Sequence, residues 1–389
     1  METFIVAPLI VGGVVAALGL LISILDGIVN NYGEVVVNIN NHTKDLTVKG
    51  GAPLLRSLSQ EKIFIPSACG GKGSCGACKA VINSDVGPLL PTETPYMSEE
   101  EKAGNVRLAC QVKVKKDIDI EIPEELFNVR EYNAVVESTR VMTYDIVELY
   151  LKLDQPVKFK AGMYMQLVIP SYKAKKKGDM SFKGTTMRAY SISSPPSDNQ
   201  SAEFLVRAMP DGRGIATSYV HHHLEPGMHI QTIGPFGDFY LQENDTTMIC
   251  IGGGSGMAPF RSILRHMKES NMMDREVWYF FGCRDYPDIY YLAEMRALEK
   301  EWPNFHCIFA LSDQELHEPE EWDESVFGPR SAIIKGRIDH VVARYMKEEI
   351  SPDSGFEAYL CGGPMMIKGC TIVLLEQGVS QDNIYYDEF

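Results

Sequence analysis

The sequence is poor in positive charge. Its 389 residues contain 37 lysines and arginines against 52 aspartates and glutamates, which gives a formal net charge of −15 at pH 7. Nucleic-acid-binding proteins carry the opposite balance, so that class is excluded as the default interpretation. With 45% hydrophobic and 23% charged residues, the chain is neither largely disordered nor a polytopic membrane protein. At roughly 150 residues per domain, its length predicts two to three globular domains.

Basic residues are absent from the start of the chain, where no lysine or arginine precedes Lys44. Residues 4–25 carry no charge at all. As a helix with about 1.5 Å per residue they would span roughly 33 Å, which is enough to cross a bilayer. A cleaved signal peptide has a basic start and a shorter apolar core, so we expect an uncleaved anchor within residues 1–28. The small residues of this run either pack against another membrane helix or are ordinary constituents of such a span.

Cysteine is not used here as a disulfide scaffold. The nine cysteines are an odd number in a chain too long to need disulfides, which predicts a reducing compartment. Three share one glycine-rich loop with the spacing C-x5-C-x2-C, and a fourth follows after 31 intervening residues. These candidate metal ligands are Cys69, Cys75, Cys78 and Cys110.

The loop around these cysteines is suited to wrapping an inorganic cluster. Its glycines permit positive φ and bring N–H groups toward the sulfur atoms. A structural zinc site is the alternative, but such sites usually offer two matched C-x2-4-C pairs. The spacing therefore favours a [2Fe-2S] cluster held by four thiolates.

Short apolar runs separated by turn residues follow from residue 130, and they predict a small antiparallel barrel. The runs are residues 133–136, 146–153, 165–169 and 202–209. The segment Arg-Ala-Tyr-Ser at 188–191 resembles the flavin-binding Arg-x-Tyr-Ser motif of the ferredoxin-reductase family. We expect Arg188 to pair with a phosphate, Tyr190 to lie against the isoalloxazine ring, and Ser191 to hydrogen-bond near its N5.

A glycine turn at 211–214 then runs into a helix that begins with small hydroxyl residues. A helix N-terminus offers free N–H groups and a positive dipole end to a pyrophosphate. The FAD-binding candidates are Arg188, Ala189, Tyr190, Ser191, Gly214, Ala216, Thr217 and Ser218, with Arg207 ranked below them.

A strand at 248–251, a glycine turn and a helix at 260–268 form a credible phosphate loop. Its pattern, G-x-G-x-x-P, resembles the NAD(P)H loop of ferredoxin reductases. The candidates are Gly252, Gly253, Gly254, Gly256, Met257 and Pro259. After the next strand, Arg284 would favour a 2′-phosphate and Asp285 a free ribose diol, so these residues leave NADH and NADPH open.

Two segments near the end of the chain resemble the nicotinamide side of the same family. A strand at 358–361 leads into Cys361, Gly362, Gly363 and Pro364, which look like the family's C-G-x-P segment facing the nicotinamide. Phe389 matches the terminal aromatic residue that covers the flavin ring in relatives. The alternative for Phe389 is an apolar tail packed on the sheet.

Over its whole length the chain resembles the NADH-oxidising F subunits of the bacterial sodium-translocating NADH:quinone oxidoreductase. The departures are Gly363 in place of a proline, a short segment at 170–187, and no residues after the terminal aromatic. The resemblance implies a multidomain fold. It comprises an N-terminal transmembrane helix (1–28), a β-grasp [2Fe-2S] ferredoxin-like α+β domain (33–128), an antiparallel β-barrel FAD domain (130–241) and an α/β Rossmann-like NADH domain (245–389).

The resemblance also implies the chemistry. Hydride passes from NADH to FAD, and single electrons then pass to the [2Fe-2S] cluster and to membrane redox subunits that reduce a quinone. Ser191, Cys361 and Phe389 are the implied catalytic residues. We expect a single-pass protein of the bacterial inner membrane with its domains in the cytoplasm, where NADH is found. Two alternatives remain: a membrane-tethered NAD(P)H reductase of an oxygenase or desaturase, and a non-enzymatic electron carrier or sensor.

Overall fold

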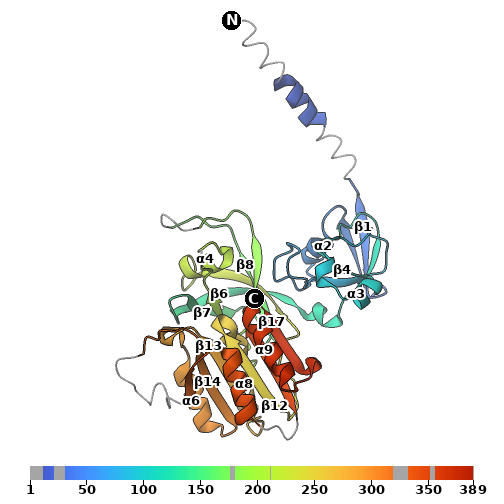
Figure 1. The fold of residues 1–389 in the computed structure, drawn as a ribbon. Helices are drawn as coiled ribbons and strands as arrows, with labels where there is room; N and C mark the ends of the chain where they lie inside the picture. Colours follow the sequence, from blue (N-terminus) through green and yellow to red (C-terminus); the bar gives the residue numbers. More distant parts are fainter. Residues whose placement is uncertain are drawn as a thin grey trace. The chain divides into compact units, whose positions relative to one another are not determined.

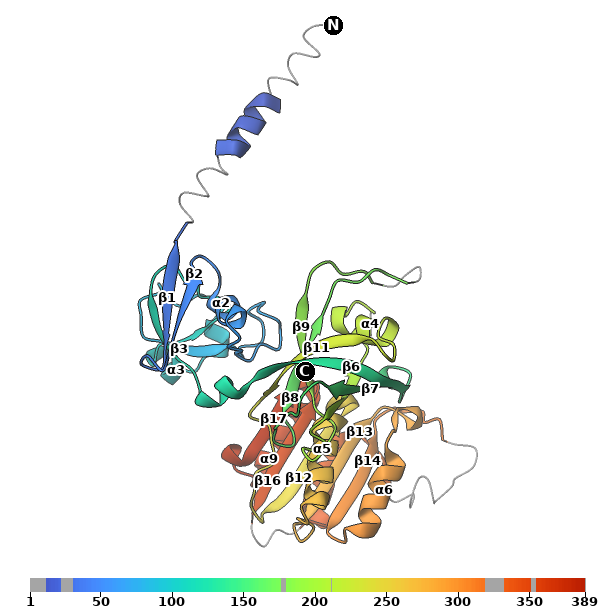
Figure 2. The ribbon, with the colours of Figure 1, turned by 180° about the vertical axis from the view of Figure 1, so that it is seen from behind.

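The computed structural model describes residues 12–21, 31–175, 180–210, 212–318, 332–350 and 355–388 (Figures 1 and 2). The chain forms two compact units, residues 1–129 and residues 130–389. Residues 12–21 are helical, and no helix in the described ranges is both long and apolar enough to cross a bilayer. Most of the predicted anchor lies outside those ranges, as does Phe389.

The first unit is built on a mixed sheet of five strands in the order β2-β1-β5-β3-β4. Its elements are β1 (Glu34–Ile39), β2 (Lys44–Lys49), α2 (Leu54–Gln60), β3 (Lys79–Ile82), α3 (Glu99–Ala103), β4 (Val106–Leu108) and β5 (Ile118–Glu121). β1 and β2 form an antiparallel hairpin, and β1 pairs in parallel with β5. Leu54 and Leu58 of α2 pack into the core formed by the alternate, inward-facing residues of the strands.

A six-stranded antiparallel sheet opens the second unit, in the order β10-β7-β6-β11-β8-β9. Its elements are β6 (Arg130–Val141), β7 (Ile146–Leu153), β8 (Tyr164–Ile169), β9 (Thr186–Ser191), β10 (Ser201–Arg207), α4 (Ile215–His222) and β11 (His229–Phe236). A bridge between Ile192 and Phe204 joins its two edges, so the sheet closes into a barrel. β6 is longer than the predicted run 133–136 because its polar, outward-facing residues continue the pairing with β7 and β11.

The remainder of the second unit is a parallel sheet in the order β15-β14-β13-β12-β16-β17. Its elements are β12 (Thr247–Gly253), α5 (Met257–Glu269), β13 (Val277–Cys283), α6 (Leu292–Glu301), β14 (Phe305–Leu311), β15 (Ile333–Lys335), α8 (Ile338–Glu348), β16 (Phe356–Gly362), α9 (Pro364–Glu376) and β17 (Ile384–Glu388). The chain moves outward from β12 to β15 and then returns to the other side of β12 with β16. The boundary between β12 and β16 is therefore the switch point at which α/β sheets bind ligands.

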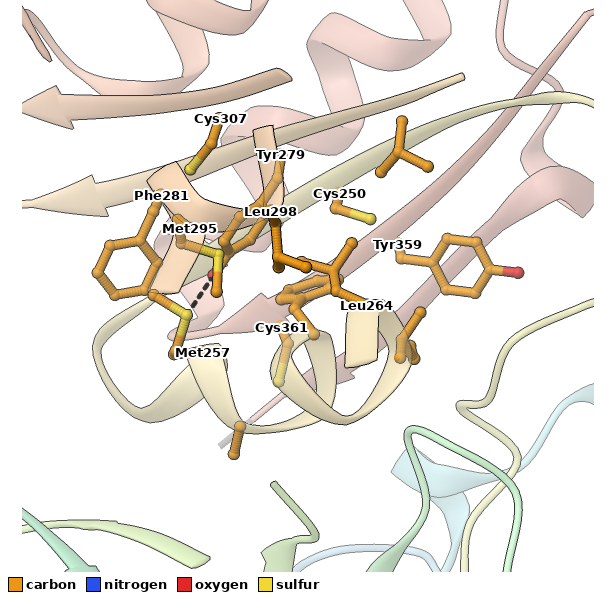
Figure 3. Close-up of a cluster of buried hydrophobic side chains, with 14 of the residues drawn as sticks. Cys250, Met257, Leu264, Tyr279, Phe281, Met295, Leu298, Cys307, Tyr359 and Cys361 are labelled. Carbon is orange, nitrogen blue, oxygen red and sulfur yellow. Dashed lines mark hydrogen bonds between the residues drawn. The ribbon is translucent and has the colours of Figure 1, made fainter. Parts of the chain in front are cut away.

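Helices cover both faces of this sheet. α8 and α9 lie over one face in Figure 1, and α5 and α6 lie over the other in Figure 2. The strands are accordingly apolar along nearly their whole length. The α5 side of the core is rich in sulfur, with Cys250, Cys307, Cys361 and Met257 around Tyr279, whose hydroxyl donates to Met257 Sδ over 3.0 Å (Figure 3).

Five short 3₁₀ helices complete the described elements. They are η1 (Thr94–Tyr96), η2 (Glu124–Asn128), η3 (Gly254–Gly256), η4 (Tyr286–Asp288) and η6 (Gln381–Asn383). The five cysteines outside the 69–110 region are all buried, in the strands of the parallel sheet or in α9.

Candidate functional site

The cysteine loop of the first unit adopts the backbone that its glycines allow. Gly70, Gly71, Gly73 and Gly76 all have positive φ, between 67° and 82°. The Lys72 N–H points at Cys69 Sγ, 3.2 Å away, and the Gln111 side-chain amide lies 3.6 Å from Cys110 Sγ. A Cβ at Gly76 would lie 2.7 Å from Cβ of Tyr96, so only glycine fits there. The loop therefore turns backbone and amide donors toward sulfur.

Side-chain hydrogen bonds join Cys69 to Cys75 and Cys78 to Cys110, and Cys75 also interacts electrostatically with Cys78. Burial opposes ionisation of Cys69, but hydrogen bonds from Ser74, Lys72 and Cys75 lower its pKa to about 7. The hydrogen bond from Cys78 lowers the pKa of Cys110 to about 6, while the same contact and burial raise the pKa of Cys78. Each pair thus contains a thiol that ionises readily, as a metal ligand must.

Among the described residues, no three or more His, Cys, Asp or Glu side chains converge on the position of a single ion. A four-cysteine [2Fe-2S] cluster places two cysteines on each iron. Tetrahedral structural zinc needs all four ligands around one centre. The preference for a two-iron cluster over zinc therefore continues to rest on the spacing of the four cysteines.

In the barrel, β9 presents the predicted flavin motif. All six residues of β9 are half-buried, which leaves one side of the strand open to a planar ligand. Arg188 Nη1 donates to the Thr186 hydroxyl over 2.9 Å and to the Met187 carbonyl over 2.6 Å. Burial raises the pKa of Tyr190, which keeps its hydroxyl neutral. These contacts hold the Arg188 guanidinium beside its own strand.

The predicted pyrophosphate helix is α4, which has Gly214 at its N-cap and no side chain capping its first N–H groups. The Thr217 and Ser218 hydroxyls donate to the carbonyls of Gly214 and Gly212, and Ala216 is buried. A Cβ on Gly214 would lie 2.2 Å from Thr217 Oγ1. The turn therefore leaves the backbone amides of the first helical turn available to an anion.

Arg207 lies beside the predicted NAD(P)H loop, the glycine turn that follows β12. Its Nε donates to Asp145 Oδ2 over 2.8 Å, and its Nη1 would be 2.8 Å from a Cβ on Gly254. Both arginine and aspartate line a cavity of about 400 Å³ that Gly254 also lines. The structure thus puts Arg207, at the end of β10, against the loop after β12, and its flavin-phosphate role stays a prediction.

The two glycine segments of the parallel sheet meet at the switch point. A Cβ on Gly256 would lie 2.0 Å from the carbonyl oxygen of Cys361, and one on Gly253 would lie 2.8 Å from Met366 Sδ. Met257 and Pro259 are buried in the first turns of α5, where they shape the loop from below. Gly363 caps α9 with Pro364 as its first residue. Two helix N-termini and two glycine turns therefore converge, as a dinucleotide phosphate site requires.

Tyr290 also supports the glycine turn after β12, and this role was not predicted from the sequence. Its buried hydroxyl donates to the Gly254 carbonyl over 2.6 Å. Gly254 has φ +58, so this bond fixes a left-handed residue at the centre of the turn. A tyrosine in an apolar run gives no signal of such a role.

The flavin motif and the nicotinamide segment are joined by a residue that was also missed, Asp387. The Ser191 hydroxyl donates to Asp387 Oδ2 over 3.0 Å, across the interface of the barrel and the parallel sheet. Asp387 lies opposite Cys361 in the register of β16 and β17. Burial raises the pKa of Asp387 although the Ser191 bond opposes this, and burial likewise raises the pKa of Cys361. A carboxylate among the aromatic residues 385–389 was the available signal.

The cavity continues over the carboxyl ends of β13 to β15. Arg284 lines it together with three residues that were not predicted from the sequence, Asp288, Arg337 and Asp339. Asp285 contacts His317 through both its carboxylate oxygens and lies outside the cavity lining.

Three family models match successive parts of the chain. They describe a 2Fe-2S iron-sulfur cluster binding domain at residues 37–115, an oxidoreductase FAD-binding domain at 133–240 and an oxidoreductase NAD-binding domain at 250–371. The cofactors expected from the motifs, a [2Fe-2S] cluster, FAD and NADH, are thereby confirmed at the level of the domains.

Curated relatives match nearly the whole chain. The F subunit of the Na(+)-translocating NADH-quinone reductase of Marinomonas sp. is 34% identical over 92% of this chain and 91% of the relative. The corresponding F subunit of Neisseria gonorrhoeae is 34% identical over 97% of this chain and 96% of its own. Among solved structures, the Amycolatopsis cytochrome P450 reductase GcoB has a TM-score of 0.69 at 25% identity and covers 91% of this chain and 98% of its own. With the three cofactor domains in the same order, the chain belongs to the family of F subunits of the Na(+)-translocating NADH-quinone reductase.

Proposed function

We propose that this chain oxidises NADH and delivers the electrons, through FAD and a [2Fe-2S] cluster, to partner subunits of a sodium-translocating NADH-quinone reductase. The observation that carries the proposal is the Ser191–Asp387 hydrogen bond. It brings the flavin motif of the barrel to the strand that pairs with Cys361, beside both glycine turns. A hydride donor and its acceptor have to meet at such a point.

In this proposal the parallel sheet binds and orients the nucleotide. The N–H groups of the turn after β12 hold the pyrophosphate, and Tyr290 keeps that turn in shape. Cys361, Gly362 and Gly363 place the nicotinamide against the barrel. The buried aromatic and sulfur-containing core beneath the turn excludes water from this end. Arg207, charge-paired with Asp145, adds a cation to the same cavity.

The barrel has the complementary task. Arg188 and the N-terminus of α4 hold the FAD phosphates, and the Ser191 hydroxyl donates a hydrogen bond at the isoalloxazine edge, with Asp387 as its present acceptor. FAD, when bound, accepts a hydride and releases electrons singly. Phe389 is proposed to cover the ring, two residues beyond Asp387.

The first unit would hold the cluster through Cys69, Cys75, Cys78 and Cys110. The N–H donors of the loop stabilise negative charge on sulfur and so favour the cluster's reduced form. We further propose that residues 4–25 anchor the chain in the bacterial inner membrane with the domains in the cytoplasm. The uncharged run and the place of the named relatives in a multi-subunit reductase support this.

An anaerobic titration of the full-length chain with NADH tests the proposal. Flavin absorbance and the electron paramagnetic resonance of the reduced cluster would be recorded on the same samples. We expect the flavin to bleach and a [2Fe-2S] signal to grow at substoichiometric NADH. A Cys110→Ala variant provides the matched control, because it should retain flavin bleaching and lose the cluster signal.

Two results would contradict the proposal. If NADH leaves both centres oxidised while another donor reduces them, the direction or the donor is wrong. If both centres are reduced but electrons pass only to a soluble oxygenase and never to a quinone-reducing membrane fraction, the acceptor is wrong. Reduction of a membrane quinone pool by NADH on adding the chain to membranes that lack it separates these cases.

A further inference from the structure

The part of the nucleotide cavity farthest from the phosphate turn carries two arginines that are already neutralised. In the sheet order, β12 with its glycine turn is followed by β13, β14 and β15. Arg284 follows β13, Ser312 follows β14 and Arg337 follows β15, and all three line the cavity. A dinucleotide with its pyrophosphate at β12 extends its adenosine ribose toward these residues.

Each guanidinium group is engaged by a carboxylate through two contacts. Arg337 Nη2 lies 2.7 Å from Asp339 Oδ2, and its Nε lies 3.2 Å from Oδ1. Arg284 contacts both oxygens of Asp288, at 3.2 and 3.3 Å. Such forks satisfy the geometry that an arginine would otherwise offer to a phosphate.

In the pair of Arg337 with Asp339, the two side chains differ in their exposure to solvent. The Arg337 side chain is 66% exposed, whereas that of Asp339 is only 13% exposed. The His340 N–H donates to Asp339 Oδ1 over 3.0 Å, and a Cβ on Gly369 of α9 would lie 3.1 Å from Asp339 Oδ2. Asp339 is therefore a rigid counter-charge that holds an exposed arginine at the cavity wall.

From this arrangement we infer that Asp339 selects NADH over NADPH by neutralising Arg337. A 2′-phosphate carries up to two negative charges and would have to displace a fixed carboxylate to reach Arg337. A ribose 2′-hydroxyl requires no such displacement. The Ser312 hydroxyl donates to the Cys283 carbonyl over 3.2 Å, so it too is committed within the protein. The inference rests on the proposed NADH site and adds the residue that sets its specificity.

The substitution Asp339→Asn tests this inference. Asparagine has the same shape and its Oδ1 still accepts the His340 N–H, but it no longer neutralises Arg337. Binding of 2′,5′-ADP and of 5′-AMP to the full-length protein would be measured by titration calorimetry, a readout that does not depend on hydride transfer. We expect the affinity for 2′,5′-ADP relative to 5′-AMP to rise about tenfold, since a charged hydrogen bond to phosphate is gained. The ratio of flavin-reduction rates with NADPH and NADH should rise in parallel.

Two further variants control the charge and the fold. Glu348→Gln removes an exposed carboxylate from the other end of α8 and should leave the ratio unchanged. Adding Arg337→Ala to Asp339→Asn should abolish the gain. Should Asp339→Asn fail to fold, Arg337→Gln alters only an exposed side chain. It leaves Asp339 uncompensated and should lower relative 2′,5′-ADP affinity several-fold.

The inference is overturned if a folded Asp339→Asn protein binds 2′,5′-ADP no better than the parent, or if the gain survives the loss of Arg337. An unchanged ratio in Arg337→Gln would overturn it as well. The proposed function fails separately, through absence of NADH-dependent flavin bleaching in the parent protein, whatever the outcome for 2′,5′-ADP.

Discussion

At the scale of single residues, Gly256 makes the closest approach in the nucleotide site. A methyl group there would lie 2.0 Å from the Cys361 carbonyl oxygen, and a backbone atom cannot move aside as a flexible side chain can. We therefore expect Gly256→Ala to weaken NADH binding at least tenfold, as measured by the NADH concentration needed for half-maximal flavin reduction.

Gly363 supplies the comparison for Gly256, because a Cβ there meets no atom within 4 Å. A loss in Gly363→Ala would report contact with the nucleotide, whereas a loss in Gly256→Ala reports the collision of two turns. Undiminished binding in Gly256→Ala would show that the two turns are not held together as described.

The contribution of Glu93 to the stability of the folded first unit depends on pH. Its side chain is fully buried, and it accepts hydrogen bonds from Arg107 and from the N–H groups of Leu90 and Leu108. Burial opposes ionisation, but Arg107 and these amides lower the pKa of Glu93 below its ordinary 4.5. The stabilisation is therefore complete above pH 4.5 and declines as the pH falls through the lower pKa of the folded state.

We expect Glu93→Gln to destabilise the first unit by about 3 kcal/mol at pH 7, because Arg107 is left buried without its counter-charge. Hydrogen exchange of peptides covering β3 and β4 measures this locally. The difference between parent and variant should shrink below pH 4.5, and a difference independent of pH would contradict the assignment.

A site residue could be predicted when its role requires a recognisable pattern of residue types at neighbouring positions in the sequence. The cysteine spacing and the glycine turns have one, since the chemistry requires those residue types at those positions. Tyr290 has none, because it acts on the turn after β12 from a distant segment. Asp387 was signalled only as an acidic residue among aromatic ones, and its partner Ser191 comes from β9. Asp339 lies two residues from its partner Arg337, but no local pattern places this pair at the nucleotide cavity. The contact of Arg207 with the turn after β12 has no local pattern either, because folding brings β10 and that turn together.

At the scale of elements, the turn after β12 depends on the segment between β13 and α6. Tyr290 donates to the Gly254 carbonyl from that segment. We expect Tyr290→Phe to raise the dissociation constant for NADH about threefold to tenfold, since one buried hydrogen bond contributes about 1 kcal/mol and its loss leaves a carbonyl unpaired. The dependence of the flavin-reduction rate on NADH concentration, recorded by stopped-flow absorbance, measures this change.

Tyr345→Phe on α8 is the matched change, because it removes a hydroxyl from the opposite face of the sheet. Equal affinity in the two variants would contradict a role for Tyr290 in shaping the turn. Strand and helix positions were largely predictable here, because period-2 and apolar runs report directly on burial. The three-residue β15, which positions Arg337, is too short to produce such a pattern.

At the scale of the whole molecule, a network of polar contacts connects the barrel to the parallel sheet. Tyr291 donates to Glu148 of β7, and the Arg261 guanidinium lies 4.4 Å from the centre of the Tyr291 ring. Arg261 in turn contacts Glu203 of β10 and Glu294 of α6. These contacts therefore join β7 and β10 of the barrel to the segment around α5 and α6.

We expect Tyr291→Phe to lower the rate of flavin reduction at saturating NADH about threefold to tenfold with little change in NADH affinity, because small misplacements slow hydride transfer. Stopped-flow absorbance separates rate from affinity. Tyr150→Phe, which removes a hydroxyl bonded to Ser201 within the barrel, should leave both unchanged. An effect on affinity alone would contradict the assigned role.

The burial of five cysteines has a practical consequence. Cys250, Cys283, Cys307, Cys361 and Cys370 are all shielded in the folded second unit, so a soluble alkylating reagent reaches none of them. Of the remaining four, Cys78 and Cys110 are also buried, whereas Cys69 and Cys75 are partly exposed and are the ones that iron would protect from the reagent. Intact-mass spectrometry of the alkylated native protein then measures the fraction of chains that have lost the cluster. Neither absorbance nor electron paramagnetic resonance is needed for this measurement.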